Sequence, residues 1–222
     1  EDRYLVNPYQ RSWYLRKIRE LKRADLCLAI SDSAMGEAIR ELNIAPHKVV
    51  NISSAVDEIF KKPNLKETNF THQIFKKFKI ERPYVMYTGG IDWRKNVNNL
   101  IIAYAELDQK LRKSYQLAIV CKVTEEVESE LRSIQSSLKL PIDSVVLTNF
   151  VDDNELVFLY QNCALFVFPS FHEGFGLPAL EAMACGAPTI GANTSSLPEV
   201  IGEPQALFDP SSVDDLAGLM EK

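Results

Sequence analysis

Two glutamates with a glycine turn between them form the stretch of this chain that is best suited to chemistry. Glu173 and Glu181 stand eight positions apart, and Gly174 and Gly176 lie between them. An apolar run at residues 164–168 comes before the turn and a run of small apolar residues follows it, which predicts a strand, a turn and a helix. A helix start presents free backbone N–H groups and a positive dipole end. The unit therefore predicts a site for an anion or a polar, hydroxylated ligand.

The surroundings of Glu181 favour a ligand as the partner of its carboxylate. Glu181 lies among small apolar residues of the predicted helix, where a lone carboxylate is costly to bury unless it accepts hydrogen bonds. Vicinal ribose hydroxyls are suitable donors to such a group. His172 precedes the turn and can donate to a sugar or a phosphate, although a histidine that is hydrogen-bonded within its own loop is an equal alternative.

A second glycine turn carries two adjacent cations. Gly89 and Gly90 follow a predicted strand at residues 84–88, and Arg94 and Lys95 stand where the next helix starts. Cations at a helix start oppose the helix dipole, so they indicate an anionic ligand such as a diphosphate. The spacing is neither that of the dinucleotide fingerprint nor that of a P-loop. A solvated Arg-Lys pair is the alternative interpretation.

Neither a metal site nor a disulfide is indicated by the sequence. The four cysteines are widely separated and include no C-x-x-C pair: Cys27, Cys121, Cys163 and Cys185. This usage is typical of buried, reduced thiols in a cytosolic protein. The three histidines do not cluster, and the acidic pair Asp152–Asp153 fits a helix cap better than a set of metal ligands. We therefore expect no bound metal and no cofactor.

The bulk composition is that of a globular chain and excludes two function classes. The chain has 222 residues, of which 46% are hydrophobic and 25% charged, and its net charge is −5. Binding to nucleic acid usually needs a strongly basic face, so we do not expect it. No apolar run approaches the roughly 20 residues of a membrane-spanning helix. Because the chain starts at Glu1 and its last helix ends without a cap, we expect it to be a piece of a longer protein.

Predicted strands and helices alternate along the chain. The strands are predicted at residues 25–30, 48–52, 84–88, 117–121, 145–147, 165–168, 188–192 and 206–208. The helices are predicted at residues 10–23, 32–43, 73–78, 97–111, 124–137, 154–161 and 179–184, and from residue 212 on. This α/β order predicts a Rossmann-like, doubly wound parallel sheet from about residue 61, with the tail of a second Rossmann-like domain before it. Ligands of such sheets bind at the carboxyl ends of the strands, so the turns at 89–95 and 170–177 are expected to line one crevice.

The first predicted helix, residues 10–23, is amphipathic and basic. Trp13, Ile18 and Leu21 give one apolar face, and six basic residues surround it. We interpret it as a helix packed on a sheet with a solvated basic face, because apolar and basic residues mix in most surface helices. A helix that lies on an anionic membrane surface is the alternative.

On these residues the chain resembles the retaining, nucleotide-sugar-dependent glycosyltransferases of family 4, also called group 1 glycosyltransferases. Residues 172–186 resemble that family's E-x7-E signature, and Gly90 with residues 94–96 resembles its upstream phosphate-binding stretch. Residues 195–202 are similar to the next segment of the family pattern, and the whole resemblance covers most of residues 24–222. It implies the GT-B architecture, in which the C-terminal one of two Rossmann-like domains holds most of the donor.

The resemblance also implies a role for each site residue. Arg94 and Lys95, with Gly90, would bind the donor diphosphate, and Glu181 would bind the donor ribose. Glu173 would be the catalytic residue, because it would hold the transferred sugar and stabilise positive charge that develops on it. The residues that would surround the transferred sugar and the leaving phosphate are His172, Glu173, Gly174, Phe175, Gly176 and Leu177. The family needs no bound metal.

The resemblance divides the chain into three parts. Residues 1–56 would be the C-terminal part of the N-terminal acceptor domain, 57–82 an interdomain linker with a small helix, and 83–222 the nucleotide-sugar donor-binding domain. The family's acceptor site and a loop histidine near the donor sugar belong to the part of the N-terminal domain that comes earlier. We therefore expect this piece to bind donor weakly and not to turn over alone.

The activity that the resemblance implies is transfer of a hexose from a nucleotide diphosphate sugar to a growing glycan, such as a bacterial O-antigen or another surface polysaccharide. The resemblance around residues 189–209 favours mannose from GDP-mannose, and a UDP-sugar donor (glucose, GlcNAc or GalNAc) is the alternative. The expected partners are the nucleotide-sugar donor and a glycan or lipid-linked glycan acceptor. The expected location is the cytoplasm, with peripheral contact at the cytoplasmic face of the inner membrane.

Two other classes of function remain open at this point. The two glutamates fit the acid and the nucleophile of a glycosidase, which would need no diphosphate site. A sensor domain that binds a nucleotide sugar without acting on it is the second alternative.

Overall fold

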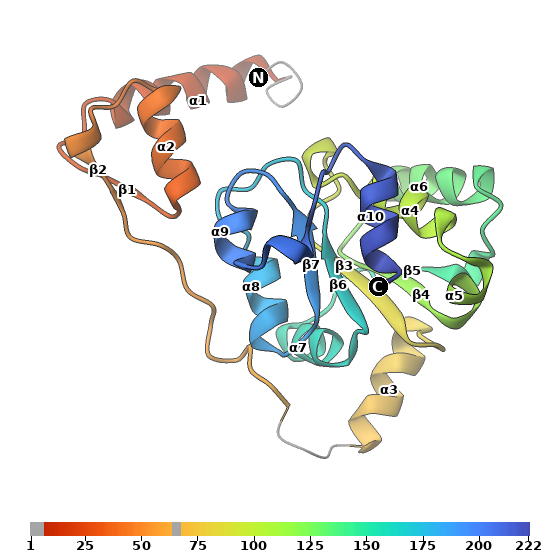
Figure 1. Cartoon of the computed structure of the whole chain (residues 1–222). Helices are drawn as coiled ribbons and strands as arrows, with labels where there is room; N and C mark the ends of the chain where they lie inside the picture. The colour runs from red at the N-terminus through yellow and green to blue at the C-terminus, as the bar shows by residue number, and fades with distance from the viewer. Residues whose placement is uncertain (1–6, 64–67) are drawn as a thin grey trace. The chain divides into compact units, whose positions relative to one another are not determined.

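The computed structural model describes residues 7–63 and 68–222 (Figure 1). The chain forms two compact units, Glu1–Ser54 and Ala55–Lys222. Each unit has an apolar core of its own, so each is described by itself. Residues 1–6 of the expected acceptor-domain tail and residues 64–67 of the expected linker lie outside the described residues.

The first unit is a small β-α-β layer preceded by a helix. Its elements are α1 (Pro8–Leu21), β1 (Cys27–Ala29), α2 (Asp32–Arg40), the 3₁₀ helix η1 (Pro46–Lys48) and β2 (Val49–Asn51). The strands β1 and β2 pair in parallel, as the alternation predicts. Ser31 caps α2 by accepting a hydrogen bond from the N–H of Ala34, which satisfies one of the free donors at the helix start.

The helix α1 buries none of its residues. Trp13 keeps 54% of its surface exposed, and its ring lies 6.0 Å from the Nζ atom of Lys17. The expected packing of the apolar face of α1 on a sheet is therefore not seen among the residues that the structure describes. None of the helices in residues 7–63 and 68–222 is long and apolar enough to cross a lipid bilayer.

The second unit is built on a six-stranded parallel sheet, which confirms the predicted fold. The strands stand in the order β5-β4-β3-β6-β7-β8. Their bounds are β3 (Tyr84–Thr88), β4 (Gln116–Val120), β5 (Val145–Leu147), β6 (Leu165–Phe168), β7 (Thr189–Ala192) and β8 (Leu207–Phe208). The order runs one way from β3 to β5 and the other way from β6 to β8, so the switch point of the sheet lies between β3 and β6.

Helices cover both faces of this sheet. Figure 1 shows α4, α6 and α10 on one side and α7, α8 and α9 on the other, and α10 packs against α4 while α8 packs against α7 and α9. The α-helices are α3 (Thr68–Phe78), α4 (Val97–Glu106), α5 (Gln109–Ser114), α6 (Glu125–Ser137), α7 (Asp153–Asn162), α8 (Leu177–Ala184), α9 (Leu197–Ile201) and α10 (Val213–Met220). The 3₁₀ helices are η2 (Trp93–Lys95), η3 (Ile142–Ser144) and η4 (Pro204–Ala206).

The central strands are buried on both faces, which is why they read as nearly continuous apolar runs in the sequence. All five residues of β4 are buried, as are the last three of β6. The helix α3 shares this core, because its Ile74 and Phe78, and Ile80 just after it, are buried in the same cluster as the strands. Part of the segment expected as a linker therefore packs as a helix on the sheet domain.

One helix prediction was wrong, and one helix was not predicted. Residues 97–111 form two helices, because Leu107 leaves the helical conformation after α4 and Asp108 starts α5 by accepting from the N–H of Lys110. Apolar spacing continues across the break, so periodicity alone did not reveal it. The helix α9 was not predicted, since its five residues are too few for a periodic pattern.

Candidate functional site

The two glycine turns meet at the switch point of the sheet. They follow β3 and β6, which are neighbours in the sheet. The backbone N–H of Phe171 donates to the carbonyl oxygen of Arg94 over 2.7 Å, which ties one turn to the other. The two turns therefore lie next to each other, as expected for turns that follow neighbouring strands.

An ion pair joins the turns at their centre. The Nζ atom of Lys95 lies 2.6 Å from Oε1 of Glu173, and the two side chains are only 14% and 11% exposed. Lys95 also lies over the ring of Phe168, with Nζ 5.6 Å from the centroid. Because water is largely excluded, this charge-assisted hydrogen bond is stronger than one at the surface. The structure thus puts one cation and one carboxylate of the sequence pattern in direct contact.

Arg94 has a different partner from its neighbour. Its guanidinium binds both carboxylate oxygens of Asp92, with Nε 2.9 Å from Oδ1 and Nη2 3.2 Å from Oδ2. Asp92 also accepts from the backbone N–H of Arg94 and so caps η2. The sequence predicts that both cations bind one anionic ligand. In the structure, Arg94 pairs with Asp92 and Lys95 pairs with Glu173.

Two serines hold the loop that carries Glu173. The hydroxyl of Ser195 accepts from the N–H of Glu173 over 2.9 Å. The buried hydroxyl of Ser196 lies 2.6 Å from the carbonyl oxygen of Phe175 and 3.1 Å from that of Glu173. These bonds fix the backbone on both sides of the carboxylate, so Glu173 is held at its place by the loop after β7. Neither serine was predicted from the sequence to have this role.

The start of α8 presents unused hydrogen-bond donors. The N–H groups of Phe175, Gly176 and Leu177 have no acceptor among the residues that the structure describes. Gly176 adopts φ +107°, and a Cβ atom at this position would lie 2.6 Å from Cδ2 of Leu197. The positive φ therefore disfavours any side chain here, and a Cβ atom would also require the Leu197 side chain to shift. Free donors and the helix dipole make this end of α8 attractive to an anion.

Glu181 lies on α8, half-buried, and is held by a tyrosine that was not predicted from the sequence. The hydroxyl of Tyr160 on α7 donates to Oε2 of Glu181 over 2.9 Å. Burial raises the pKa of the Glu181 carboxyl above its ordinary value, while the hydrogen bond from Tyr160 acts in the opposite direction and nearby Asp153 adds to the rise. Burial, followed by the neighbouring Glu181, also raises the pKa of Tyr160. The phenol therefore stays protonated and remains a donor.

The conformation of the turn after β3 depends on Gly89 and Asn96, which flank the predicted site residue Gly90. Gly90 contributes its carbonyl oxygen, which accepts from the buried hydroxyl of Tyr87 over 2.6 Å. Gly89 is the glycine that the backbone requires, because it adopts φ +143° and a Cβ there would meet the Tyr87 hydroxyl at 2.8 Å. Asn96 adopts φ 58° and donates to the carbonyl oxygens of Pro169 and Pro210. Asparagine tolerates this left-handed conformation better than most residues, so Asn96 could have been predicted from the sequence as a turn residue.

His172, in the turn after β6, is exposed. No three side chains of the histidine, cysteine, aspartate or glutamate type gather into a metal site within residues 7–63 and 68–222. The charges that the described site offers a ligand are therefore those of its own side chains and of the helix start.

A family model described as "Glycosyl transferases group 1" matches residues 69–222, which is more than half of the chain. The chain belongs to the group 1 glycosyltransferases. The resemblance inferred from the two glutamates and the upstream cations is confirmed, and the site lies within the matched range.

Mannosyltransferases are among the similar curated proteins. The chain is 41% identical to the serotype-specific mannosyltransferase WbdA of Escherichia coli over 222 residues, which are all of this chain and 27% of that protein. It is 31% identical to the O-antigen chain mannosyltransferase B of Escherichia coli over 214 residues, which are 95% of this chain and 55% of that protein. The chain thus spans between about a quarter and a half of the length of these relatives.

A solved structure supports the GT-B fold. The structure of HepE from Anabaena, in complex with UDP and glucose, superposes with a TM-score of 0.80 at 19% sequence identity. The match covers 99% of this chain and 59% of that protein. At this level of identity the likeness concerns the fold.

Proposed function

We propose that this chain is the donor-binding part of a retaining mannosyltransferase that uses GDP-mannose and extends a bacterial O-antigen or a related surface polysaccharide. Membership of the group 1 family supports the glycosyl transfer. The similarity to WbdA over the whole chain and to the O-antigen chain mannosyltransferase B supports mannose and the O-antigen acceptor.

One observation carries the proposal furthest, namely the Lys95–Glu173 pair beside the free N–H groups of α8. A cation and three unused backbone donors fit an anionic group such as a diphosphate. A carboxylate in direct contact with that cation fits the sugar that the diphosphate carries. A glycosidase would need two carboxylates and no anion site, so this arrangement favours transfer from an activated donor over hydrolysis of a plain glycoside.

We propose the following roles, which the family resemblance implies and with which this geometry is consistent. Lys95 and Arg94 hold the diphosphate, while the loop from Gly174 to Leu177 donates to it through its backbone. Glu173 holds the transferred sugar, with His172 at the rim, and Glu181 accepts from the ribose hydroxyls. Gly90 lets the turn after β3 approach the phosphates closely. We propose that no metal is needed, since the cations and the helix start supply the positive charge.

The chemical step breaks the bond between the anomeric carbon and the diphosphate oxygen, and the electron pair leaves with the diphosphate. Lys95, Arg94 and the start of α8 stabilise that charge. Glu173 stabilises the positive charge left on the sugar. The acceptor hydroxyl then bonds to the anomeric carbon on the face that the diphosphate leaves, and its proton passes to the departing diphosphate oxygen. The anomeric configuration is thereby retained.

The site assignment is tested on the full-length protein by calorimetry with GDP. The double variant Arg94→Ala, Lys95→Ala should lose measurable binding, because both cations of the site are removed. Lys110→Ala, Lys113→Ala removes two exposed cations of α5 and serves as the matched control, which should bind GDP normally. Unchanged affinity in the first variant would overturn the assignment.

The donor is tested with a thermal-shift series on the same full-length protein. GDP-mannose should raise the unfolding temperature more than UDP-glucose, UDP-GlcNAc or UDP-GalNAc does, because the protein binds it more tightly. If a UDP-sugar raises the unfolding temperature more than GDP-mannose does, that UDP-sugar is the donor and the mannose assignment is wrong. Binding without transfer to any O-antigen acceptor would instead indicate a sensor domain.

We further propose that the acceptor is lipid-linked and that the full protein meets the cytoplasmic face of the membrane. The exposed aromatic and basic side chains of α1 support peripheral contact with anionic lipid. Full-length protein should sediment with phosphatidylglycerol vesicles more than with phosphatidylcholine vesicles, and Trp13→Ala should reduce that fraction. Equal sedimentation with both kinds of vesicle would contradict the membrane contact.

A further inference from the structure

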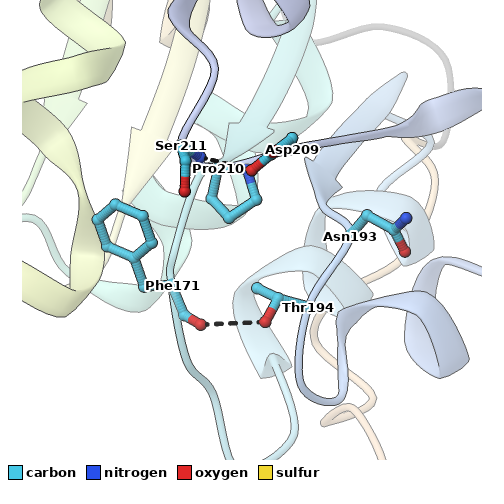
Figure 2. A pocket seen from close by; sticks show the side chains of 6 residues that line it. All are labelled: Phe171, Asn193, Thr194, Asp209, Pro210 and Ser211. Atoms are coloured by element: carbon cyan, nitrogen blue, oxygen red, sulfur yellow. Dashed lines mark hydrogen bonds between the residues drawn. The ribbon is translucent and has the colours of Figure 1, made fainter.

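A hollow of about 430 Å³ lies beside the proposed donor site, at the carboxyl ends of β6, β7 and β8 (Figure 2). Its volume falls within the range of small-molecule sites, about 300–1,000 Å³. The residues that line it are Phe171, Asn193, Thr194, Asp209, Pro210 and Ser211. None of them is among the residues proposed above to hold the donor. Phe171 nevertheless belongs to the loop that carries Glu173, so the hollow adjoins the place of the transferred sugar.

The lining of this hollow combines one aromatic ring with several short polar side chains. The amide of Asn193 has no hydrogen-bond partner among the described residues. Asp209 uses Oδ1 to accept from the N–H of Ser211 over 2.8 Å, which leaves Oδ2 available. Figure 2 shows Phe171 and Asn193 on opposite sides of the hollow, with Pro210 between them. A ligand there meets donors, acceptors and an apolar surface at once.

This combination selects among classes of ligand. A phosphate or carboxylate would meet the Asp209 charge and no lysine or arginine among the six lining residues. A metal ion would find only one carboxylate, which is too few oxygen ligands for a stable site. A neutral ligand with many hydroxyl groups satisfies the amide, the carboxylate and the serine hydroxyl, and the C–H faces of its rings suit Phe171. The chemistry therefore fits a saccharide.

The walls of the hollow are held in place before any ligand binds. The hydroxyl of Thr194 donates to the carbonyl oxygen of Phe171 over 3.3 Å, as the dashed line in Figure 2 shows. Asn96 donates to the carbonyl oxygen of Pro210 over 2.8 Å. The ring of Phe171 packs against Trp93 with a centroid distance of 6.2 Å. A preformed site loses less conformational entropy when it binds a flexible glycan.

We propose that this hollow is a subsite for a sugar unit of the acceptor glycan, close to the unit that receives the transferred hexose. The proposal rests on the proposed function, because it assumes a glycan acceptor. It predicts that acceptors long enough to reach the hollow bind better than a single sugar does. The growing chain would be retained between transfers by contacts on the donor-binding domain itself.

The test uses the full-length protein with the double variant Asn193→Ala, Asp209→Asn. Asparagine at position 209 keeps an oxygen for the N–H of Ser211, and the Asn193 side chain is exposed, so folding should be preserved. Transfer is compared between methyl α-mannoside and linear mannotetraose as acceptors. We expect kcat/KM for mannotetraose to fall about tenfold, the effect of losing roughly 1.4 kcal/mol of binding free energy. The values for methyl α-mannoside and for the donor should stay unchanged.

The matched control is the double variant Gln205→Ala, Asp214→Asn. These two residues line a different hollow beside β8 and are equally exposed and polar, and the variant changes the net charge in the same way. It should transfer to both acceptors like the unaltered protein. An equal effect of the first variant on both acceptors, or no effect on either, overturns the subsite.

A direct binding measurement separates this inference from the proposed function. Mannotetraose is titrated into the full-length protein without donor and followed by saturation-transfer NMR. Binding that the first variant weakens and the control preserves supports the subsite whatever the transfer activity is. If mannotetraose does not bind to the unaltered protein, the subsite is overturned. The donor site is tested separately, by GDP binding to the Arg94→Ala, Lys95→Ala variant.

Discussion

At the scale of single residues, the Glu173 carboxylate and the proposed donor diphosphate would compete for the ammonium group of Lys95. Lys95 binds Glu173 over 2.6 Å in a largely buried pair, and in the proposed function a donor diphosphate needs the same cation. A buried ion pair is expensive to break on one side only, because the remaining charge is left without a partner. Under the proposed function, the diphosphate would therefore have to pair with Lys95 when the Glu173 carboxylate moves to the sugar.

The variant Glu173→Gln tests this competition. Without the carboxylate Lys95 is fully available, so we expect GDP to bind several-fold more tightly, up to about tenfold. Sugar transfer should fall by at least about a hundredfold, because stabilisation of the charge that develops on the sugar is lost. Calorimetry with GDP and a transfer assay on the full-length protein give the two values. Weaker GDP binding in this variant would contradict the competition.

Tyr160→Phe tests the hydrogen bond to Glu181 through the pH dependence of donor binding. Burial raises the pKa of Glu181 and the bond from Tyr160 lowers it, so removing the hydroxyl raises the pKa further. The ribose binding proposed for Glu181 needs the ionised carboxylate, so it should be lost as the pH falls through that pKa. The acid limb of a plot of donor affinity against pH should therefore move to higher pH.

Tyr104→Phe is the control for this effect. Tyr104 is also fully buried, and its hydroxyl donates to the carbonyl oxygen of Tyr115 over 2.8 Å. Both variants should lose about 1 kcal/mol of unfolding free energy, the ordinary value of one hydrogen bond. Only Tyr160→Phe should move the acid limb. If the acid limb of donor affinity lies at the same pH in both variants, Tyr160 has a purely structural role.

The charged residues of the site could be predicted from the sequence better than the residues that support them. Glu173 and Lys95 were predicted because charged side chains at a glycine turn before a helix are typical of sites for anions and sugars. Tyr160 was missed because helical spacing shows which face of α7 is buried, and says nothing about which hydroxyl reaches across to α8. Ser196 was missed for the same reason, since its hydroxyl meets a loop more than twenty positions away in the chain.

At the scale of elements, α8 depends on the turn that starts it. Gly176 combines φ +107° with a close approach to Leu197, whereas Gly218 lies inside α10 with open space around it. Gly176→Ala should lower the unfolding free energy by about 1–3 kcal/mol because of strain. Gly218→Ala should raise it by about 0.5–1 kcal/mol, since alanine is favoured inside helices. Denaturant unfolding of both variants measures the contrast, and similar values would contradict the strain.

Strands were predicted more accurately than helices for a physical reason. The predicted bounds of β3, β5 and β6 agree with the structure, because strands buried on both faces are short apolar runs that end abruptly at polar turns. Helix ends depend on local capping instead. The break before α5 depends on one side chain, Asp108, which apolar periodicity does not register.

At the scale of the whole molecule, the sequence predicted the parallel sheet and left the strand order open. Alternation of strands and helices favours parallel pairing, but it does not say which strands are neighbours. The neighbours β3 and β6 are far apart in the sequence, because β3 ends at Thr88 and β6 starts 77 positions later, at Leu165. That long-range pairing brings Lys95 to Glu173. The candidate site therefore depends on topology as much as on the two motifs.

The two units should differ in stability because their cores differ in size. Within the described residues 7–54, the first unit buries four apolar side chains, Cys27, Ala29, Ile44 and Val49. The second unit has a core that spans its sheet and both helix layers. Amides of β1 and β2 should therefore exchange with solvent faster than those of β3, β4 and β6. Hydrogen exchange followed by mass spectrometry on this chain measures the difference.

Addition of GDP to the same hydrogen-exchange experiment tests where the nucleotide binds. A ligand that binds only the folded second unit stabilises that unit by about 2.7 kcal/mol at a concentration one hundred times its Kd. The slowest amides of β3, β4 and β6 should then exchange about a hundredfold more slowly, while those of β1 and β2 keep their rates. The Arg94→Ala, Lys95→Ala variant should show no change in either unit at the same concentration. Equal slowing in both units would contradict a donor site that the second unit builds by itself.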